Sequence, residues 1–114
     1  FQHVSVISSE QIQELIESPS VSVLYFYVKD SQNVREFLEE FEKSAKYLKV
    51  YNITLAMYKC SGDLNDHEMC KQDNVDNNVY TYQNGAELLT FTLETMFDVN
   101  SIIANALQLL LLHQ

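Results

Sequence analysis

The chain has 114 residues, 46% of them hydrophobic, with two glycines, one proline and a formal net charge of −9. This composition predicts one domain, residues 1–114, with a single apolar core, and it excludes disordered and fibrous classes. No apolar stretch approaches the roughly 20 residues of a membrane span. The negative charge disfavours nucleic acid and anionic membrane surfaces as partners, because phosphate binding needs clustered Lys and Arg.

Strands and helices alternate along the first half of the chain. Residues 4–7 predict a short strand, and the following serines can cap a helix that Pro19 ends. Residues 21–28 are almost continuously apolar and rich in β-branched and aromatic side chains. That pattern predicts a central strand buried on both faces. Asp30 or Ser31 then caps a long helix whose apolar residues recur at helical spacing.

The second half predicts another strand over residues 53–59, a polar stretch and a short helix over residues 67–71. Two further strands, residues 79–82 and 88–93, are joined through Asn84-Gly85, a dipeptide typical of hairpin turns. Asp98 or Asn100 caps a closing amphipathic helix. The expected order is β-α-β-α-β-α-β-β-α, an α/β fold with a central mixed sheet flanked by helices.

This order resembles the thioredoxin-like domains of the protein disulfide isomerase family. The resemblance covers essentially the whole chain and is carried by the strand-helix junction at residues 23–41, residues 51–60, Cys70, the Asn84-Gly85 hairpin, and residues 95–103 with the closing helix. It implies a thioredoxin-like fold and a location in the lumen of the endoplasmic reticulum, in the secretory pathway. It also implies protein partners or clients and neighbouring thioredoxin-like domains in the same polypeptide.

The family carries its Cys-x-x-Cys motif at the start of the helix after the central strand. The four residues in register with that motif are here Gln32, Asn33, Val34 and Arg35. Disulfide exchange needs an accessible thiolate, and none of these side chains supplies one. The resemblance therefore implies a domain without catalytic residues at this position.

A cis-proline opposite the motif is the second signature of the family's active site. The position in register with it falls in residues 76–78, and Asn77 is the best candidate. A non-proline residue would lose about 2.5–4 kcal/mol by remaining cis, so we expect a trans peptide bond and an altered substrate-pairing surface. Together, these two departures predict that the chain is not an enzyme.

The two cysteines are placed on adjoining elements. Cys60 ends a strand and Cys70 follows ten residues later, a return that can bring the two Cα atoms within bonding range. Two reduced, buried thiols and a disulfide are both compatible with this spacing. The resemblance favours the disulfide, because it implies an oxidising lumen and because several family members carry a bridge between these elements. Such a bridge would contribute about 2–3 kcal/mol.

A zinc site is the sharper alternative for this region. Cys60, His67 and Cys70, with Asp63 or Asp66 nearby, lack the paired cysteine and histidine spacings that make a zinc prediction strong. We therefore expect neither a metal nor another cofactor. His67 and Cys70 at i,i+3 also lack a third group to orient them as a nucleophile-base pair, so we expect His67 to be a solvated surface residue.

Three further features bear on partners. The triplet Asn52-Ile53-Thr54 is an N-glycosylation sequon, which is either a plausible acceptor in a luminal protein or an ordinary turn. Val34 and Phe37, beside the vacant motif, are candidates for a partner-facing patch, although both could be core residues. The apolar end of the last helix, residues 109–112, predicts packing against a following domain.

The sequence thus predicts a non-catalytic thioredoxin-like module that binds or scaffolds partner or client proteins. Two alternatives remain. The first is weak thiol-disulfide exchange through Cys60 and Cys70, which would require an exposed thiol with a low pKa. The second is low-affinity calcium buffering by the acidic surface, similar to the thioredoxin-like domains of calsequestrin. The 16 acidic residues form no long runs, which disfavours this second alternative.

Overall fold

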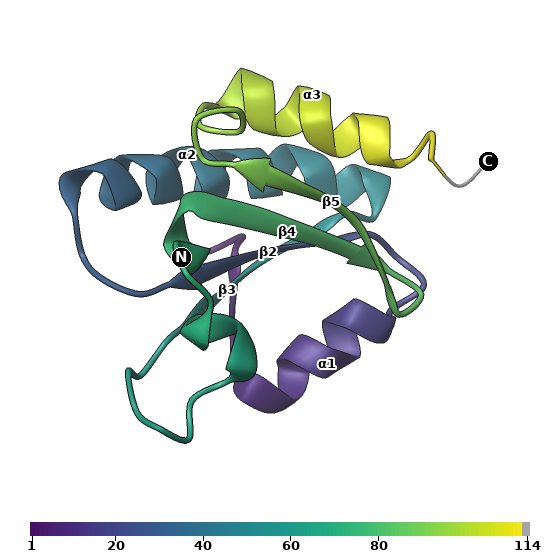
Figure 1. Ribbon diagram of the computed structural model, residues 1–114. Coiled ribbons are helices and arrows are strands. Elements are labelled where there is room, and N and C mark those ends of the chain that lie inside the picture. Colours follow the sequence, from purple (N-terminus) through teal and green to yellow (C-terminus); the bar gives the residue numbers. More distant parts are fainter. Residues whose placement is uncertain (113–114) are drawn as a thin grey trace.

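A computed structural model describes residues 1–112 and contains five strands and three α-helices in that range (Figure 1). The strands are β1 (Ser5–Ile7), β2 (Ser22–Tyr27), β3 (Thr54–Lys59), β4 (Asn78–Gln83) and β5 (Ala86–Thr92). The helices are α1 (Ser9–Glu17), α2 (Gln32–Leu48) and α3 (Val99–Leu109). None of the helices within residues 1–112 combines the length and apolar character that crossing a bilayer requires.

The strands form one mixed sheet in the order β1-β3-β2-β4-β5. β1 and β2 both run parallel to β3, whereas β4 runs antiparallel to its neighbours β2 and β5. Helices α2 and α3 lie on one face of the sheet and α1 lies on the other (Figure 1). This arrangement confirms the predicted α/β fold.

Strand β2 is central and buried on both faces, as its continuous apolar sequence predicts. Val23 and Tyr25 belong to the apolar cluster under α2 and α3, and Leu24 and Phe26 belong to the cluster against α1. The alternation follows from the two-residue period of side chains along a strand. Because β2 is fixed from both sides, its carboxyl end gives α2 a rigid starting point.

Side chains at the helix ends satisfy backbone groups that the helices leave unpaired. The hydroxyl of Ser31 accepts a hydrogen bond from the Val34 N–H at 3.2 Å and starts α2. The carboxylate of Asp98 accepts one from the Ser101 N–H at 2.8 Å and starts α3. Both caps are among the candidates that the sequence offered.

The hairpin between β4 and β5 also follows the sequence. Asn84 and Gly85 have φ values of 54° and 81°, and Gln83 pairs with Ala86 across the two-residue turn. Positive φ at both central residues is what a tight hairpin turn requires, and asparagine and glycine adopt it most readily.

The helix expected over residues 67–71 differs from the structure. That segment forms a short 3₁₀ helix, η2 (Glu68–Lys71), followed by a second, η3 (Val75–Asn77); another, η1 (Lys49–Tyr51), extends α2. The segment between β3 and β4 is mostly polar, so it offers no apolar stripe for an α-helix to bury. Only Val75 of η2 and η3 is buried.

Candidate functional site

The first turn of α2 occupies the position of the missing redox motif. Here the Gln32 side chain donates to the Glu36 carboxylate at 3.1 Å, and Arg35 forms an ion pair with Asp30 at 3.0 Å. Asn33 is exposed. The turn therefore presents amides and charges where relatives with the motif present two thiols.

Val34 and Phe37 do not form an exposed patch in this structure, which corrects the partner-facing interpretation. Val34 is 5% exposed, and Phe37 is fully buried with its ring centroid 4.9 Å from that of Tyr25 and 5.1 Å from that of Phe41. The two residues share the apolar stripe of α2 that packs on the sheet. Both residues therefore belong to the apolar core.

The segment in register with the cis-proline uses its main-chain groups internally. The Asn77 N–H donates to the Asn74 carbonyl at 2.9 Å, and the Asn77 carbonyl accepts from the Leu93 N–H at 2.8 Å. The Asp76 carbonyl accepts from the Tyr25 hydroxyl at 2.7 Å. Every peptide bond within residues 1–112 is trans, as expected at Asn77.

Burial keeps Tyr25 in the role of donor. Its side chain is fully buried, and burial, together with the negative charge of Asp76, raises the pKa of the Tyr25 hydroxyl. The hydroxyl therefore remains protonated near neutral pH and holds the Asp76 carbonyl. The Asp76 carbonyl and both main-chain polar groups of Asn77 thus already have hydrogen-bond partners within the chain.

A groove of about 770 Å³ lies between these segments. Three parts of the chain line it: the first turns of α2, the end of η3 with the start of β4, and the turn between β5 and α3. The lining residues are Asn33, Glu36, Asn74, Asn77, Asn78, Thr92, Leu93, Glu94 and Phe97. Four of the nine are asparagines, so the groove offers both hydrogen-bond donors and acceptors.

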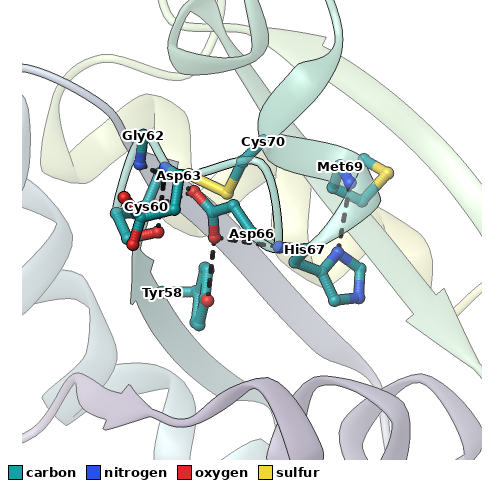
Figure 2. The surroundings of a disulfide bond; sticks show 9 residues. Tyr58, Cys60, Gly62, Asp63, Asp66, His67, Met69 and Cys70 are labelled. Atoms are coloured by element: carbon teal, nitrogen blue, oxygen red, sulfur yellow. Dashed lines mark hydrogen bonds between the residues drawn. A yellow bond between two sulfur atoms is a disulfide. The ribbon is translucent and has the colours of Figure 1, made fainter.

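The disulfide predicted between Cys60 and Cys70 is present, with an S–S distance of 2.01 Å and a Cα–Cα distance of 5.9 Å (Figure 2). Both cysteines are half-buried and pack against the apolar cluster on the α1 side. The Cys60 N–H donates to the Tyr27 carbonyl at 2.8 Å, which places the bridge where β2 and β3 end. Both thiols of the sequence are therefore consumed in this bond.

Asp66 organises the loop that the disulfide closes (Figure 2). Its carboxylate accepts hydrogen bonds from the Ser61, Gly62 and His67 N–H groups and from the Tyr58 hydroxyl, at 2.7 to 3.0 Å. Partial burial alone would raise the pKa of Asp66, but these donors together lower it. From the sequence alone Asp66 is only a candidate zinc ligand, and this structural role is not predicted.

The zinc arrangement weighed from the sequence is not assembled. A sulfur of each cysteine and a carboxylate oxygen of Asp66 lie within 4.8 Å of one another, but the sulfurs are bonded together and offer no thiolate. His67 is not simply solvated, in contrast to the prediction. It is half-buried near Phe26, with ring centroids 6.1 Å apart, and its Nδ1 accepts from the Met69 N–H at 3.1 Å.

The sequon asparagine ends η1 in a left-handed conformation, with φ of 61°. Asn52 is exposed, and its side-chain nitrogen donates to the Ser20 hydroxyl at 2.8 Å. Thr54 is half-buried at the start of β3. Glycosylation of Asn52 stays a prediction.

Comparisons with solved structures define the class of the domain. The J-Trx1 fragment of ERdj5 aligns with a TM-score of 0.72 and 13% identity, over 93% of this chain and 49% of that one. Human ERp44 (form I) aligns with a TM-score of 0.71 and 15% identity, over 92% of this chain and 29% of that one. Thioredoxin from Malassezia sympodialis aligns with a TM-score of 0.64 and 16% identity, over 92% of this chain and 89% of that one. The chain therefore has a thioredoxin-like fold.

Sequence comparison identifies the particular family. Residues 2–107 match the family described as TXNDC16 N-terminal, and the chain belongs to that family. Human thioredoxin domain-containing protein 16 is 28% identical over 105 residues, which are 92% of this chain. The chain spans only 13% of the length of that relative.

Proposed function

We propose that the chain is a non-catalytic module that binds segments of partner or client polypeptides in the groove at the vacant motif. The observation that carries this proposal is the position and lining of the groove. It lies where thioredoxin-like relatives with the motif carry out thiol exchange, yet asparagine amides, rather than thiols, dominate its walls. Amides can hydrogen-bond the N–H and C=O groups of an extended polypeptide without forming a covalent bond.

The lack of a nucleophile supports recognition without chemistry. Exchange needs one thiolate to attack a disulfide and a second thiol to resolve the mixed disulfide. Gln32 and Arg35 supply neither, and the only two cysteines in the sequence are joined to each other. The dipole at the start of α2, which would stabilise a thiolate, has none to act on.

The lumen of the endoplasmic reticulum is the proposed location. Disulfides persist in oxidising compartments and are rare in the cytosol, and the chain carries one that closes a surface loop. Its relationship to the protein disulfide isomerase family supports the same compartment.

We further propose that the far end of α3 contacts a neighbouring thioredoxin-like domain of the same polypeptide. Leu109 is fully buried, but Leu111 and Leu112 are 66% and 54% exposed just beyond the helix. This end lies away from the start of α2, where the groove is found (Figure 1). A scaffold of this kind would leave the groove open to clients.

Site-specific photocross-linking tests groove binding. Asn77 in the groove and, as a matched control, Glu14 on exposed α1 are each replaced by p-benzoylphenylalanine, and each variant is irradiated in extract from the endoplasmic reticulum lumen. We expect polypeptide adducts from position 77 that persist after treatment with reductant, and few from position 14. Equal labelling from both positions, or position-77 adducts that reductant abolishes, would contradict the proposal.

A further inference from the structure

The charges of the groove indicate which segments it takes, an inference that rests on the proposed function. Two glutamates line the groove from different segments: Glu36 on α2 and Glu94 in the turn after β5. Both are exposed. None of the nine lining residues, all within residues 1–112, is a lysine or arginine. The groove therefore carries negative charge without a cation of its own.

The basic residue of the vacant motif, Arg35, already has an acidic partner. Arg35 forms its ion pair with Asp30 at 3.0 Å and does not line the groove. The chain as a whole has a formal net charge of −9, so the long-range field also attracts cations. Within residues 1–112, the side-chain hydrogen bond that Glu36 accepts comes from a neutral donor, the Gln32 amide.

The remaining lining suits an extended chain with a long cationic side chain. The Asp76 carbonyl and both main-chain polar groups of Asn77 already have internal hydrogen-bond partners, which favours recognition of the ligand through side chains. Asparagine amides can bond its backbone. Phe97, half-buried and 6.3 Å from the Phe37 ring, offers an aromatic surface for the apolar stem or the cation of lysine or arginine.

We propose that the groove binds extended polypeptide segments that carry a lysine or arginine side chain, with the cation held by Glu36 and Glu94 and the backbone held by asparagine amides. Each exposed ion pair contributes modestly, so the charge acts as a selector among segments rather than as the whole affinity. An acidic segment at the same place would meet like charge and be rejected.

The test compares two synthetic nine-residue peptides, Gly-Ser-Ala-Arg-Ala-Lys-Ala-Ser-Gly and the same peptide with glutamine at both basic positions. Each is titrated into the ¹⁵N-labelled chain, and the side-chain NH₂ signals of Asn33, Asn74 and Asn77 report on the groove. We expect the basic peptide to bind about five to ten times more tightly than the glutamine peptide. Raising the salt concentration should reduce that ratio.

Matched variants assign the preference to the two glutamates. Glu36→Gln with Glu94→Gln should bring the ratio of the two affinities close to one. Glu14→Gln with Glu39→Gln, which changes the net charge equally but lies outside the groove lining, should leave the ratio unchanged. As the folding control, the ¹⁵N spectrum of each double variant should keep the dispersed backbone signals of the wild-type chain away from the substituted residues.

Three results would overturn the inference. Equal affinity of the wild-type chain for both peptides would contradict the charge preference. If both peptides nevertheless shift the side-chain NH₂ signals of the groove asparagines, the proposed function is still supported. An equal loss of preference in the two double variants would assign it to net charge rather than to the groove. Failure of both peptides to bind also overturns the inference, and the cross-links from position 77 then decide the proposed function separately.

Discussion

The groove and the disulfide loop lie at the same end of the central strands, because α2 begins after β2 and the loop follows its parallel neighbour β3. Each region contains only part of what a thiol enzyme needs. The groove occupies the position of the redox motif and is open, yet it contains no cysteine. The loop contains both cysteines, yet they are bonded to each other. The comparison teaches that the proposed recognition surface and the two cysteines occupy separate parts of this domain, so a loss of thiol chemistry need not remove that surface.

The two regions also differ in what holds them together. Next to the groove, α2 packs on the sheet through buried apolar residues that include Val34 and Phe37. The disulfide loop depends instead on a covalent bond and on the hydrogen bonds that Asp66 accepts. Substitutions should therefore affect stability through packing in the first region and through cross-linking and electrostatics in the second.

The largest effect is expected from the apolar core under α2. Phe37→Ala should lower the free energy of unfolding by about 3–5 kcal/mol, because it leaves a cavity among fully buried aromatic rings. Asn33→Ala, on the exposed surface above, should change it by less than about 0.5 kcal/mol. Guanidinium unfolding followed by circular dichroism measures both values. A nearly neutral Phe37→Ala would restore the partner-facing interpretation.

Removal of the disulfide should have the next largest effect. Cys60→Ala with Cys70→Ala should lower the free energy of unfolding by about 2–3 kcal/mol, since the unfolded chain regains the entropy of a loop of roughly ten residues. The same unfolding titration measures the loss. Intact-mass measurement after alkylation without reductant is the control, and the wild-type chain should take up no label. Two labels per chain would contradict the bridge itself.

A smaller, pH-dependent effect is expected at Asp66. Its folded-state pKa is lowered, so the ionised carboxylate stabilises the fold above the ordinary carboxyl pKa, and that contribution is lost as pH falls through the folded-state value. At pH 7, Asp66→Asn should cost about 1–2 kcal/mol of unfolding free energy, and the difference should shrink below about pH 4. Unfolding titrations across pH test this, with the exposed Asp63→Asn as control. A pH-independent difference would rule out the carboxylate charge as the cause.

The smallest effect is expected from restoring the motif. Gln32→Cys with Arg35→Cys should create a reducible disulfide at the start of α2 but only weak turnover of a protein disulfide. The reason is that the Asp76 carbonyl and the main-chain groups of Asn77 already have internal hydrogen-bond partners, which should weaken their pairing with a substrate. Titration with dithiothreitol detects the new disulfide, and insulin reduction measures turnover. Turnover similar to that of an active thioredoxin would show that substrate alignment survives.

Much of the fold could be predicted from local patterns. The continuous apolar run of β2, the Ser31 cap of α2 and the Asn84-Gly85 hairpin each depend on neighbouring residues, and the structure confirms them. The cysteine pairing needed the family resemblance as well, because the spacing alone left reduced thiols possible. The segment between β3 and β4 was misjudged, since a capped loop with 3₁₀ turns has no periodic signature.

The groove could not be predicted because three distant segments build it. Helical periodicity places Val34 and Phe37 on the apolar face of α2 and predicts that this face packs on the core, but it gives no information about how distant segments meet beside the helix. The feature of the sequence that could have indicated the site is a cluster of polar residues. Asn74, Asn77 and Asn78 cluster around the position where relatives carry proline, and such residues at a strand start often serve recognition.

Turnover of insulin disulfides by the unmodified chain, with dithiothreitol as reductant, tests the separation of recognition from thiol chemistry most directly. We expect a rate equal to that of dithiothreitol alone, and the same rate for Cys60→Ala with Cys70→Ala. The groove supplies no thiolate, and the bonded cysteines lie outside its lining. Turnover well above background that disappears in the double variant would contradict the account and assign an exchange activity to Cys60 and Cys70.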